Sequence, residues 1–246
     1  MRRFFIEDIT PGSRFVSIRG EEFSHLRRVL RLKKGDEVSV FNGRGLELKG
    51  TIDSMAGECA GIGITGEVEA KTESPFDITL LQAMLKGDKN ELVIAKATEL
   101  GVRRISFYAT QRTVRLIKED SKTLKRWQRV SIEALKQCNR VAVPEIDLIK
   151  DFKGALERYS NLPLKVFLYE GEETVGLNSA LGKIKTGDMK DIAVVIGPEG
   201  GFTEEEVREA SLLGYIVAGL GPRRLKSETA AISVISILQH RFGDMG

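Results

Sequence analysis

The sequence predicts an α/β protein in which a small β-rich unit precedes a larger domain built around a mostly parallel sheet. From Phe76 onward, apolar runs of strand length alternate with runs of helical period, the pattern of helices that cover a parallel sheet. Residues 1–70 instead carry short alternating runs and an Asn42-Gly43 turn, which is a strong hairpin signal. We therefore predict domains at residues 1–70 and 76–246, joined by the polar linker 71–75.

The first unit reads as a small barrel with one helix. Residues 14–18 and 37–41 alternate apolar and polar positions and predict strands, as does the glycine-rich stretch 57–70. Between them, residues 21–32 place apolar side chains at helical spacing and predict one amphipathic helix. Another face of that helix gathers three arginines, Arg27, Arg28 and Arg31.

The second unit reads as repeated strand and helix pairs. The expected strands are residues 77–85, 103–108, 144–149, 164–170, 191–197 and 215–221, and the expected helices are 91–100, 122–137, 203–214 and 228–242. The only tryptophan, Trp127, could stack on a nucleic-acid base, but its helical spacing with Leu124 and Val130 favours a core position. In such a sheet, ligands bind beyond the carboxyl ends of the strands.

Composition excludes several classes of protein. A chain with 41% hydrophobic and 30% charged residues is globular rather than disordered, and no apolar run is long enough to span a membrane. Two cysteines, Cys59 and Cys138, give no disulfide framework and indicate a cytoplasmic protein. The only histidines, His25 and His240, have no second ligand nearby in sequence, so we expect no metal site.

Positive charge is concentrated in the middle of the chain. Residues 81–140 hold fourteen Lys and Arg against six Asp and Glu. An excess of this size is typical of a surface that binds a polyanion. It is equally typical of solvated helix surfaces, and charge alone favours neither interpretation.

A glycine-rich loop at residues 196–206, IGPEGGFTEEE, marks the candidate site. It matches neither the dinucleotide nor the triphosphate motif, and its carboxylates disfavour phosphate and favour a neutral or cationic ligand. Thr203 and Glu206 form the pattern of a capping box, which starts a helix after the loop. Gly200 and Gly201 can then adopt left-handed conformations and let a ligand approach the main chain.

A second glycine loop follows the next predicted strand at residues 219–226. We expect Ser227 to cap the C-terminal helix and Glu228 to lie in its first turn, where the helix dipole favours a negative charge. Both loops would open at the same edge of the sheet. The alternative is that both are tight turns with nothing bound.

Taken together, IGPEGGFTEEE and LGPRRLKSETAA resemble the signature pair of the RsmE family of SPOUT methyltransferases. The resemblance extends along the whole chain through MRRFF, HLRRVLRLKKGD, LKGDKNELVIAKATELGV and EALKQCNR. The chain departs from the usual pattern at residues 223–226, where it reads RRLK instead of RILR.

The resemblance implies a PUA-like N-terminal barrel, a C-terminal domain with a deep trefoil knot, a homodimer, and S-adenosyl-L-methionine as cofactor. A cofactor without phosphate suits a loop that carries Glu199. The implied cofactor-binding residues are Leu168, Tyr169, Glu170, Ile196, Gly197, Pro198, Glu199, Gly200, Gly201, Leu220, Gly221, Arg224 and Leu225.

The reaction that the resemblance implies is methylation of N3 of a uridine in 16S ribosomal RNA, in the small ribosomal subunit. The N3 proton must leave, and Glu199 is a candidate base or, alternatively, a structural or adenosine-binding residue. Arg112 and Arg140 are candidates to stabilise the uracil anion or, alternatively, only to grip phosphates. The basic residues expected to contact RNA are Arg2, Arg3, Arg27, Arg28, Arg31, Lys86, Lys89, Arg112, Arg115, Arg126 and Arg140.

Two other readings stay open at this point. One is an RNA-binding protein with the same two domains that has lost catalysis, which would bind RNA but not the cofactor. The other is a SPOUT methyltransferase that acts on transfer RNA or on another base.

Overall fold

The computed structural model describes residues 1–69, 71–113, 121–171, 175–182, 184 and 190–246. They form two compact units. The N-terminal unit consists of Met1–Glu73 and Leu135–Val143, and the C-terminal unit of Ser74–Ala134 and Pro144–Gly246. The boundary between the units after Glu73 falls inside the expected linker 71–75. Leu135–Val143 belongs to the N-terminal unit, although the sequence places it in the second domain.

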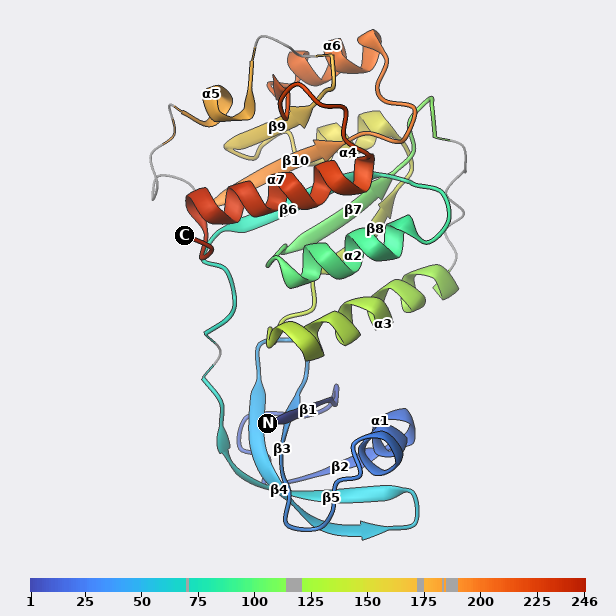
Figure 1. Cartoon of the computed structure of the whole chain (residues 1–246), viewed down its shortest axis with the longest axis vertical. Helices are drawn as coiled ribbons and strands as arrows, with labels where there is room; N and C mark the ends of the chain where they lie inside the picture. The colour runs from blue at the N-terminus through green and yellow to red at the C-terminus, as the bar shows by residue number, and fades with distance from the viewer. Residues whose placement is uncertain (70, 114–120, 172–174, 183, 185–189) are drawn as a thin grey trace. The chain divides into compact units, whose positions relative to one another are not determined.

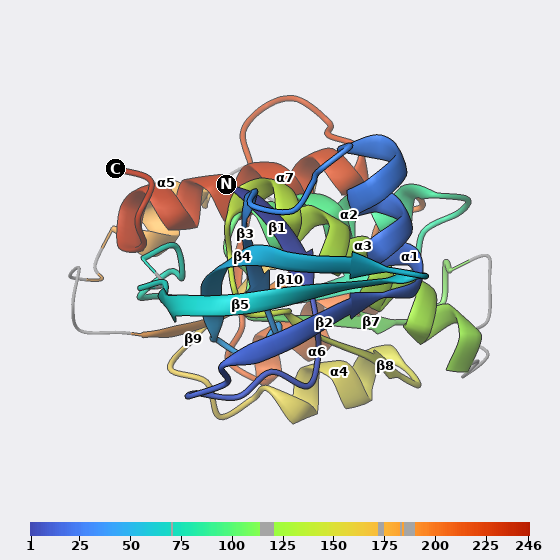
Figure 2. The same cartoon turned by 90° about the horizontal axis from the view of Figure 1, so that it is seen from below.

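The N-terminal unit is built on one five-stranded sheet with the order β1-β3-β4-β5-β2. β1 pairs with β3 in parallel, and the other pairs are antiparallel. Figure 2 shows β2, β5 and β4 running side by side. Alternate residues turn inward to a core that includes Phe4, Val40, Ile52 and Ile62. The strands are β1 (Arg2–Phe5), β2 (Phe15–Arg19), β3 (Glu37–Phe41), β4 (Glu47–Ala56) and β5 (Cys59–Glu67).

The helix of this unit is shorter and less regular than the sequence predicts. α1 (Gly20–Ser24) passes directly into a π-helical turn, η1 (His25–Val29), in which the Leu30 N–H donates to the carbonyl of His25. Arg31 then has a positive φ of 54° and ends the helix. Helical periodicity cannot reveal a turn widened by one residue, and such turns are frequent at functional sites. The three arginines of this segment are nevertheless exposed, as expected.

Two arginines that were expected to contact RNA are buried inside the N-terminal unit. The side chain of Arg3 is only 6% exposed and forms a bidentate ion pair with Glu47, while it also donates to the carbonyl oxygens of Leu135 and Arg140. Arg140 is 4% exposed and donates to the carboxylate of Glu73. The geometry therefore contradicts RNA contacts for Arg3 and Arg140, and assigns them to holding Leu135–Val143 in this unit.

The Glu73 carboxylate is a second anchor for the same segment. Its other oxygen accepts hydrogen bonds from the backbone N–H groups of Val141 and Ala142, at 2.8 and 3.1 Å. Burial acts to raise the pKa of Glu73, but the hydrogen bond and charge of Arg140 and the two N–H donors outweigh it and lower the pKa. The carboxylate is therefore held in its ionised form.

Replacing Glu73 by Gln should destabilise the protein by about 1–2 kcal/mol at neutral pH, because hydrogen bonds to charged groups are strong but this one is partly solvated. Since the folded-state pKa of Glu73 is lowered, its contribution is complete above the unfolded-state pKa and disappears as the pH falls through the folded-state value. Urea unfolding should therefore give a lower free energy of unfolding for Glu73→Gln than for the unmodified protein at neutral pH, and equal values in acid. Glu69→Gln is the control, because its ion pair with Lys71 is largely exposed to solvent. An equal loss for Glu73→Gln at both pH values would contradict the assignment.

The C-terminal unit contains a six-stranded sheet with the order β11-β9-β10-β6-β7-β8, parallel throughout. This confirms the predicted α/β class, and β11 is the edge strand next to β9. The strands are β6 (Asp77–Ala83), β7 (Arg104–Tyr108), β8 (Glu145–Ile149), β9 (Leu164–Leu168), β10 (Asp191–Ile196) and β11 (Ile216–Ala218).

Helices cover both faces of this sheet (Figure 1). Residues of α2, α5 and α7, with Trp127 of α3, share a core with one face, and residues of α4 and α6 share a core with the other. Trp127 is 4% exposed with its ring centroid 4.4 Å from that of Phe107, so the expected core position is confirmed. The helices are α2 (Lys89–Glu99), α3 (Ser121–Cys138), α4 (Phe152–Arg158), α5 (Leu177–Leu181), α6 (Glu204–Leu212) and α7 (Ser227–Phe242).

Two features of the described residues bear on the classes considered above. None of their helices combines the length and the apolar character needed to cross a lipid bilayer. Among the same residues, no three His, Cys, Asp or Glu side chains are grouped closely enough to hold a metal ion.

Candidate functional site

The candidate site lies at the carboxyl edge of the parallel sheet, where β9, β10 and β11 end in loops. The first glycine loop, residues 197–202, follows β10, and the second glycine loop, residues 219–226, follows β11. The first leads into α6 through Thr203, whose side chain accepts from the Glu206 N–H while the Glu206 carboxylate accepts from the Thr203 N–H. The predicted capping box is confirmed.

A side-chain hydrogen bond joins the two loops. The Ser227 hydroxyl, directly after the second loop, donates to the carbonyl of Gly197 in the first at 2.6 Å, and it accepts from the amide of Gln82 at 2.9 Å. Ser227 was expected to cap α7, and this is wrong: Lys226 occupies the cap position without a side-chain cap, and Ser227 is the first residue of the helix. The hydroxyl instead holds the loops together.

The shape of both loops depends on glycine at particular positions. Gly201 has a φ of 69° and Gly221 a φ of 97°, a region that side chains rarely adopt. Gly200 has no positive φ, so the left-handed conformation expected there occurs only at its neighbour. A Cβ at Gly197 would approach the Phe202 ring to 2.8 Å, so this glycine lets the loop fold back on itself.

Contacts from neighbouring elements fix the carbonyl groups of the first glycine loop. The Arg112 guanidinium donates to the carbonyl oxygens of Gly200 at 2.9 Å and Phe202 at 3.3 Å. At the end of β10, the buried Tyr108 hydroxyl donates to the carbonyl of Ile196 at 2.8 Å. Arg112, a candidate for catalysis or phosphate contact, is therefore engaged in holding the loop.

Glu199, at the tip of the first loop, is bound to the start of α2. Its carboxylate accepts from Lys89 at 2.9 Å and from the Lys86 N–H at 3.2 Å. Burial acts to raise the pKa of Glu199, but the hydrogen bonds from Lys89 and Lys86 outweigh it and lower the pKa; the bond to Glu199 in turn raises the pKa of Lys89. A paired carboxylate with a lowered pKa is a poor proton acceptor, and an engaged Lys89 is a poor phosphate ligand.

Two buried acceptors near the joined loops have no hydrogen-bond donor within the described residues. They are the side-chain oxygen Oε1 of Gln82, whose amide contacts Ser227, and Oε2 of Glu228, in the first turn of α7. An unsatisfied buried polar atom costs about 1–3 kcal/mol. The two oxygens therefore favour a ligand that supplies donors at this edge.

The end of β9 lies beside β11 and the first glycine loop. The Tyr169 N–H donates to the carbonyl of Ala218 in β11 at 3.1 Å, and a Cβ at Gly201 would lie 3.2 Å from the Glu170 carboxylate. Of the expected cofactor residues, Glu170 thus lies beside the first glycine loop, while Leu168 and Tyr169 contact the last residue of β11, directly before the second loop. Of the remaining expected cofactor residues, Ile196 and Pro198 are buried, Leu220 and Leu225 are half-buried, and Arg224 is exposed.

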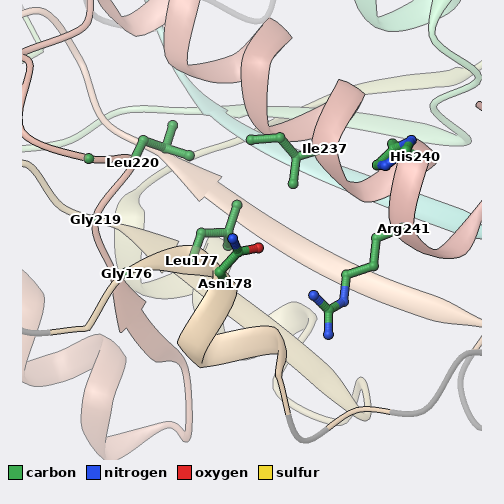
Figure 3. A pocket seen from close by; sticks show the side chains of 9 residues that line it. Gly176, Leu177, Asn178, Gly219, Leu220, Ile237, His240 and Arg241 are labelled. Atoms are coloured by element: carbon green, nitrogen blue, oxygen red, sulfur yellow. The ribbon is translucent and has the colours of Figure 1, made fainter. Parts of the chain in front are cut away.

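A pocket of about 810 Å³ opens beside the second glycine loop (Figure 3). Its volume lies in the usual range for small-molecule sites. Figure 3 shows Leu220, Leu177 and Ile237 around one end and Arg241 at the other. Leu220 and Gly221 are predicted site residues, whereas the first loop does not line this pocket. Gly219 also belongs to the second glycine loop. Sequence reasoning missed the others, which α5, the residue before it and α7 bring in from distant positions: Gly176, Leu177, Asn178, Ile237, His240 and Arg241.

The remaining basic residues that were expected to contact RNA are mostly accessible. Arg2, Arg27, Arg28, Arg31 and Lys86 are exposed. Arg126 is 63% exposed and pairs with Glu91 and Asp88. Arg115 lies outside the described residues.

Family models match both parts of the chain. An RNA methyltransferase domain model matches residues 72–239, and an RNA methyltransferase PUA domain model matches residues 18–57. The predicted PUA-like character of the N-terminal unit is thereby confirmed.

Full-length relatives agree with these models. Ribosomal RNA small subunit methyltransferase E of Bacillus subtilis is 32% identical over 98% of this chain and 97% of the relative, and the protein of the same name from Buchnera aphidicola of Acyrthosiphon pisum is 30% identical over 98% and 94%. A Legionella pneumophila structure, described as a methyltransferase in complex with the bound cofactor SAM, is 31% identical with a TM-score of 0.87 over 98% of both chains. A Neisseria gonorrhoeae ribosomal RNA small subunit methyltransferase E bound to S-adenosyl methionine is 28% identical, with a TM-score of 0.86 over the full length of both. The resemblance read from the two glycine loops is therefore confirmed, and the chain belongs to the ribosomal RNA small subunit methyltransferase E family.

Proposed function

We propose that the protein transfers the methyl group of S-adenosyl-L-methionine to N3 of one uridine in 16S ribosomal RNA. The observation that carries the proposal is the pair of hydrogen-bonded glycine loops at the carboxyl edge of the sheet, in a chain that matches a ribosomal RNA methyltransferase over 98% of its length. Structural neighbours of the same family were solved with this cofactor.

The residues at the site fit S-adenosylmethionine, which supplies an activated methyl group on a sulfonium. The cofactor has hydroxyl and amino donors for the unpartnered oxygens of Gln82 and Glu228, and it has no phosphate to be repelled by Glu199 or by the acidic start of α6. Gly201 and Gly221 leave the main chain open to close approach. We therefore assign cofactor binding to the ends of β9 and β10 and to the second glycine loop.

Glu199 and Arg112 act in this scheme as positioning residues for the first glycine loop. Each holds the loop through a contact described above, Glu199 to α2 and Arg112 to two loop carbonyls. A preorganised loop fixes the geometry of methyl transfer without reorganisation during the reaction. Arg140, which is buried in the N-terminal unit, has a structural role.

RNA recognition is assigned in part to the exposed arginines of the N-terminal unit. Arg27, Arg28 and Arg31 lie on or just after the π-helical turn, and they can contact phosphates. The target uracil has to leave its base stack to reach a site in the C-terminal unit, which favours an unpaired nucleotide. Exposed arginines that contact phosphates suit a structured RNA, so we propose the assembled small subunit, in the cytoplasm, as the substrate.

The proposal includes a homodimer and a knotted C-terminal unit. Support for a subunit contact comes from exposed apolar side chains on two helices of this unit, Leu92 of α2 and Ile237 of α7. Light scattering at micromolar concentration should then give about twice the chain mass of 27.3 kDa. The mass of a single chain at that concentration would contradict the dimer.

Replacing Arg112 by Ala should weaken binding of S-adenosylmethionine about tenfold, because two loop carbonyls lose their donor and the loop loses its bound shape. Calorimetry with the cofactor measures the effect. Arg126→Ala is the matched control, since it removes an exposed arginine of the same unit that pairs with Glu91 of α2 and with Asp88 directly before that helix. If the Arg112 variant and the unmodified protein bind the cofactor with equal affinity, the first glycine loop is not part of the cofactor site.

The proposed function is tested by incubating the protein with S-adenosylmethionine labelled on its methyl group, together with small ribosomal subunits from cells that lack this activity. We expect label in the RNA of assembled subunits and much less in protein-free 16S RNA. Binding of RNA without binding of the cofactor would instead identify a non-catalytic homologue. Label in transfer RNA but not in the subunit would identify a methyltransferase with another substrate.

A further inference from the structure

The N-terminal unit carries a second pocket, of about 480 Å³, on the outer face of its sheet. It lies where β2, β5 and β4 run side by side, and none of its residues belongs to the site described above. The pocket is lined by Arg14, Phe15, Thr51, Asp53, Gly63, Ile64 and Thr65.

The register of the sheet explains why a hollow forms here. Phe15 of β2 pairs with Gly63 of β5, which pairs with Thr51 of β4. Paired residues of antiparallel strands place their side chains on the same face. Because Gly63 has no side chain, a gap opens between the Phe15 ring and β4. A Cβ at Gly63 would overlap the Asp53 carboxylate, so that carboxylate lies over the floor of the gap.

Three side chains that line the pocket are exposed to solvent. Phe15 is 77% exposed, a costly position for an aromatic ring. Arg14 and Asp53 are both exposed, and neither forms an ion pair with any residue that the structure describes. An aromatic face, a free cation and a free acceptor thus surround one hollow.

We propose that this pocket binds one unpaired nucleotide of the RNA substrate. The base stacks on the Phe15 ring, Arg14 contacts the phosphate, and the Asp53 carboxylate accepts hydrogen bonds from the edge of the base. Stacking on an aromatic side chain with hydrogen bonds to the base edge is how proteins read single-stranded RNA. The inference rests on the proposed function only in taking RNA as the substrate.

The carboxylate also predicts which base the pocket prefers. Asp53 offers two acceptor oxygens side by side, and guanine offers two neighbouring N–H donors on its Watson–Crick edge. Uracil, cytosine and adenine lack this pair. The pocket should therefore prefer guanine among unpaired bases.

The same observations disfavour a protein partner. A stable protein interface buries roughly 800 Å² on each side around an apolar centre. Here one ring stands between an arginine and an aspartate, which is too small an apolar surface for such a centre and fits a single nucleotide.

Fluorescence anisotropy with labelled single-stranded RNA hexamers tests the proposal. Oligouridine with one central guanosine is compared with the same oligonucleotide carrying adenosine or cytidine there. Phe15→Ala and Phe15→Leu should each bind the guanosine hexamer about tenfold more weakly, since leucine restores apolar area but not stacking. Asp53→Asn should lose the preference for guanosine. Leu212→Ala, which truncates an exposed apolar side chain of the C-terminal unit, should bind like the unmodified protein.

Several results would overturn the proposal. The pocket is not the binding site if both Phe15 variants bind RNA normally, and stacking is not the interaction if Phe15→Leu binds normally while Phe15→Ala does not. An unchanged base preference in Asp53→Asn would refute the role of the carboxylate. A change of oligomeric mass in Phe15→Ala would identify a subunit contact instead. Thermal melting checks that each variant is folded. The assay measures RNA binding without methyl transfer, so it tests the pocket separately from the reaction. If the unmodified protein methylates no RNA, but Phe15→Ala still weakens RNA binding, the proposed reaction is refuted and the nucleotide pocket is supported.

Discussion

Gly221→Val should reduce the affinity for S-adenosylmethionine on the order of 100-fold or more, measured by calorimetry. Gly221 has a φ of 97°, a conformation closed to a β-branched residue, so the second glycine loop has to move. No atom lies within 4 Å of the added Cβ, so the effect comes from the backbone and not from a clash. The fold should persist, because the loop lies outside the packed core.

Gly12→Val provides the matched control for this prediction. Gly12 has a φ of 83°, also with nothing within 4 Å of an added Cβ, but it lies in the N-terminal unit. Its local strain is similar, and we expect unchanged cofactor affinity. If Gly221→Val also binds the cofactor normally, the second glycine loop is not part of the cofactor site.

The double variant Arg27→Glu, Arg31→Glu should lose most of its affinity for small-subunit RNA. Both side chains are exposed on or beside the π-helical turn, and their reversal replaces attraction to phosphates by repulsion. The dependence of log affinity on log salt should become shallower by about one unit for each lost phosphate contact. Filter binding across a salt series measures both quantities, and cofactor affinity should stay unchanged.

The control for this variant is Lys150→Glu, Lys153→Glu, which makes the same change of net charge at exposed positions in and just before α4. It should retain RNA affinity. If the two double variants weaken binding equally, net charge and not the turn governs RNA recognition.

Local patterns predicted the parts of the fold that neighbouring residues determine. The capping box of Thr203 and Glu206 is a contact across three residues, and the alternation of strands and helices follows from burial on both faces of a parallel sheet. Trp127 was placed correctly because helical period indicates which side of a helix is buried.

Contacts between distant residues were not predictable in this way. The resemblance implied that Arg3 and Arg140 contact RNA, although both pair with carboxylates 44 and 67 positions away in sequence and are buried. The cap pattern at Ser227 was misread because Gly197, thirty residues earlier, accepts its hydroxyl. Likewise, the pocket beside the second glycine loop combines α5 with the last turns of α7, which no single motif contains.

The most direct test of the account is the identity of the modified nucleoside. Small ribosomal subunits from cells lacking the activity are treated with the protein and S-adenosylmethionine, their RNA is digested to nucleosides, and the products are identified by mass spectrometry, with primer extension to map the position. The account predicts 3-methyluridine at one position of 16S RNA. A methylated ribose, a methylated guanine or no modified nucleoside would contradict it.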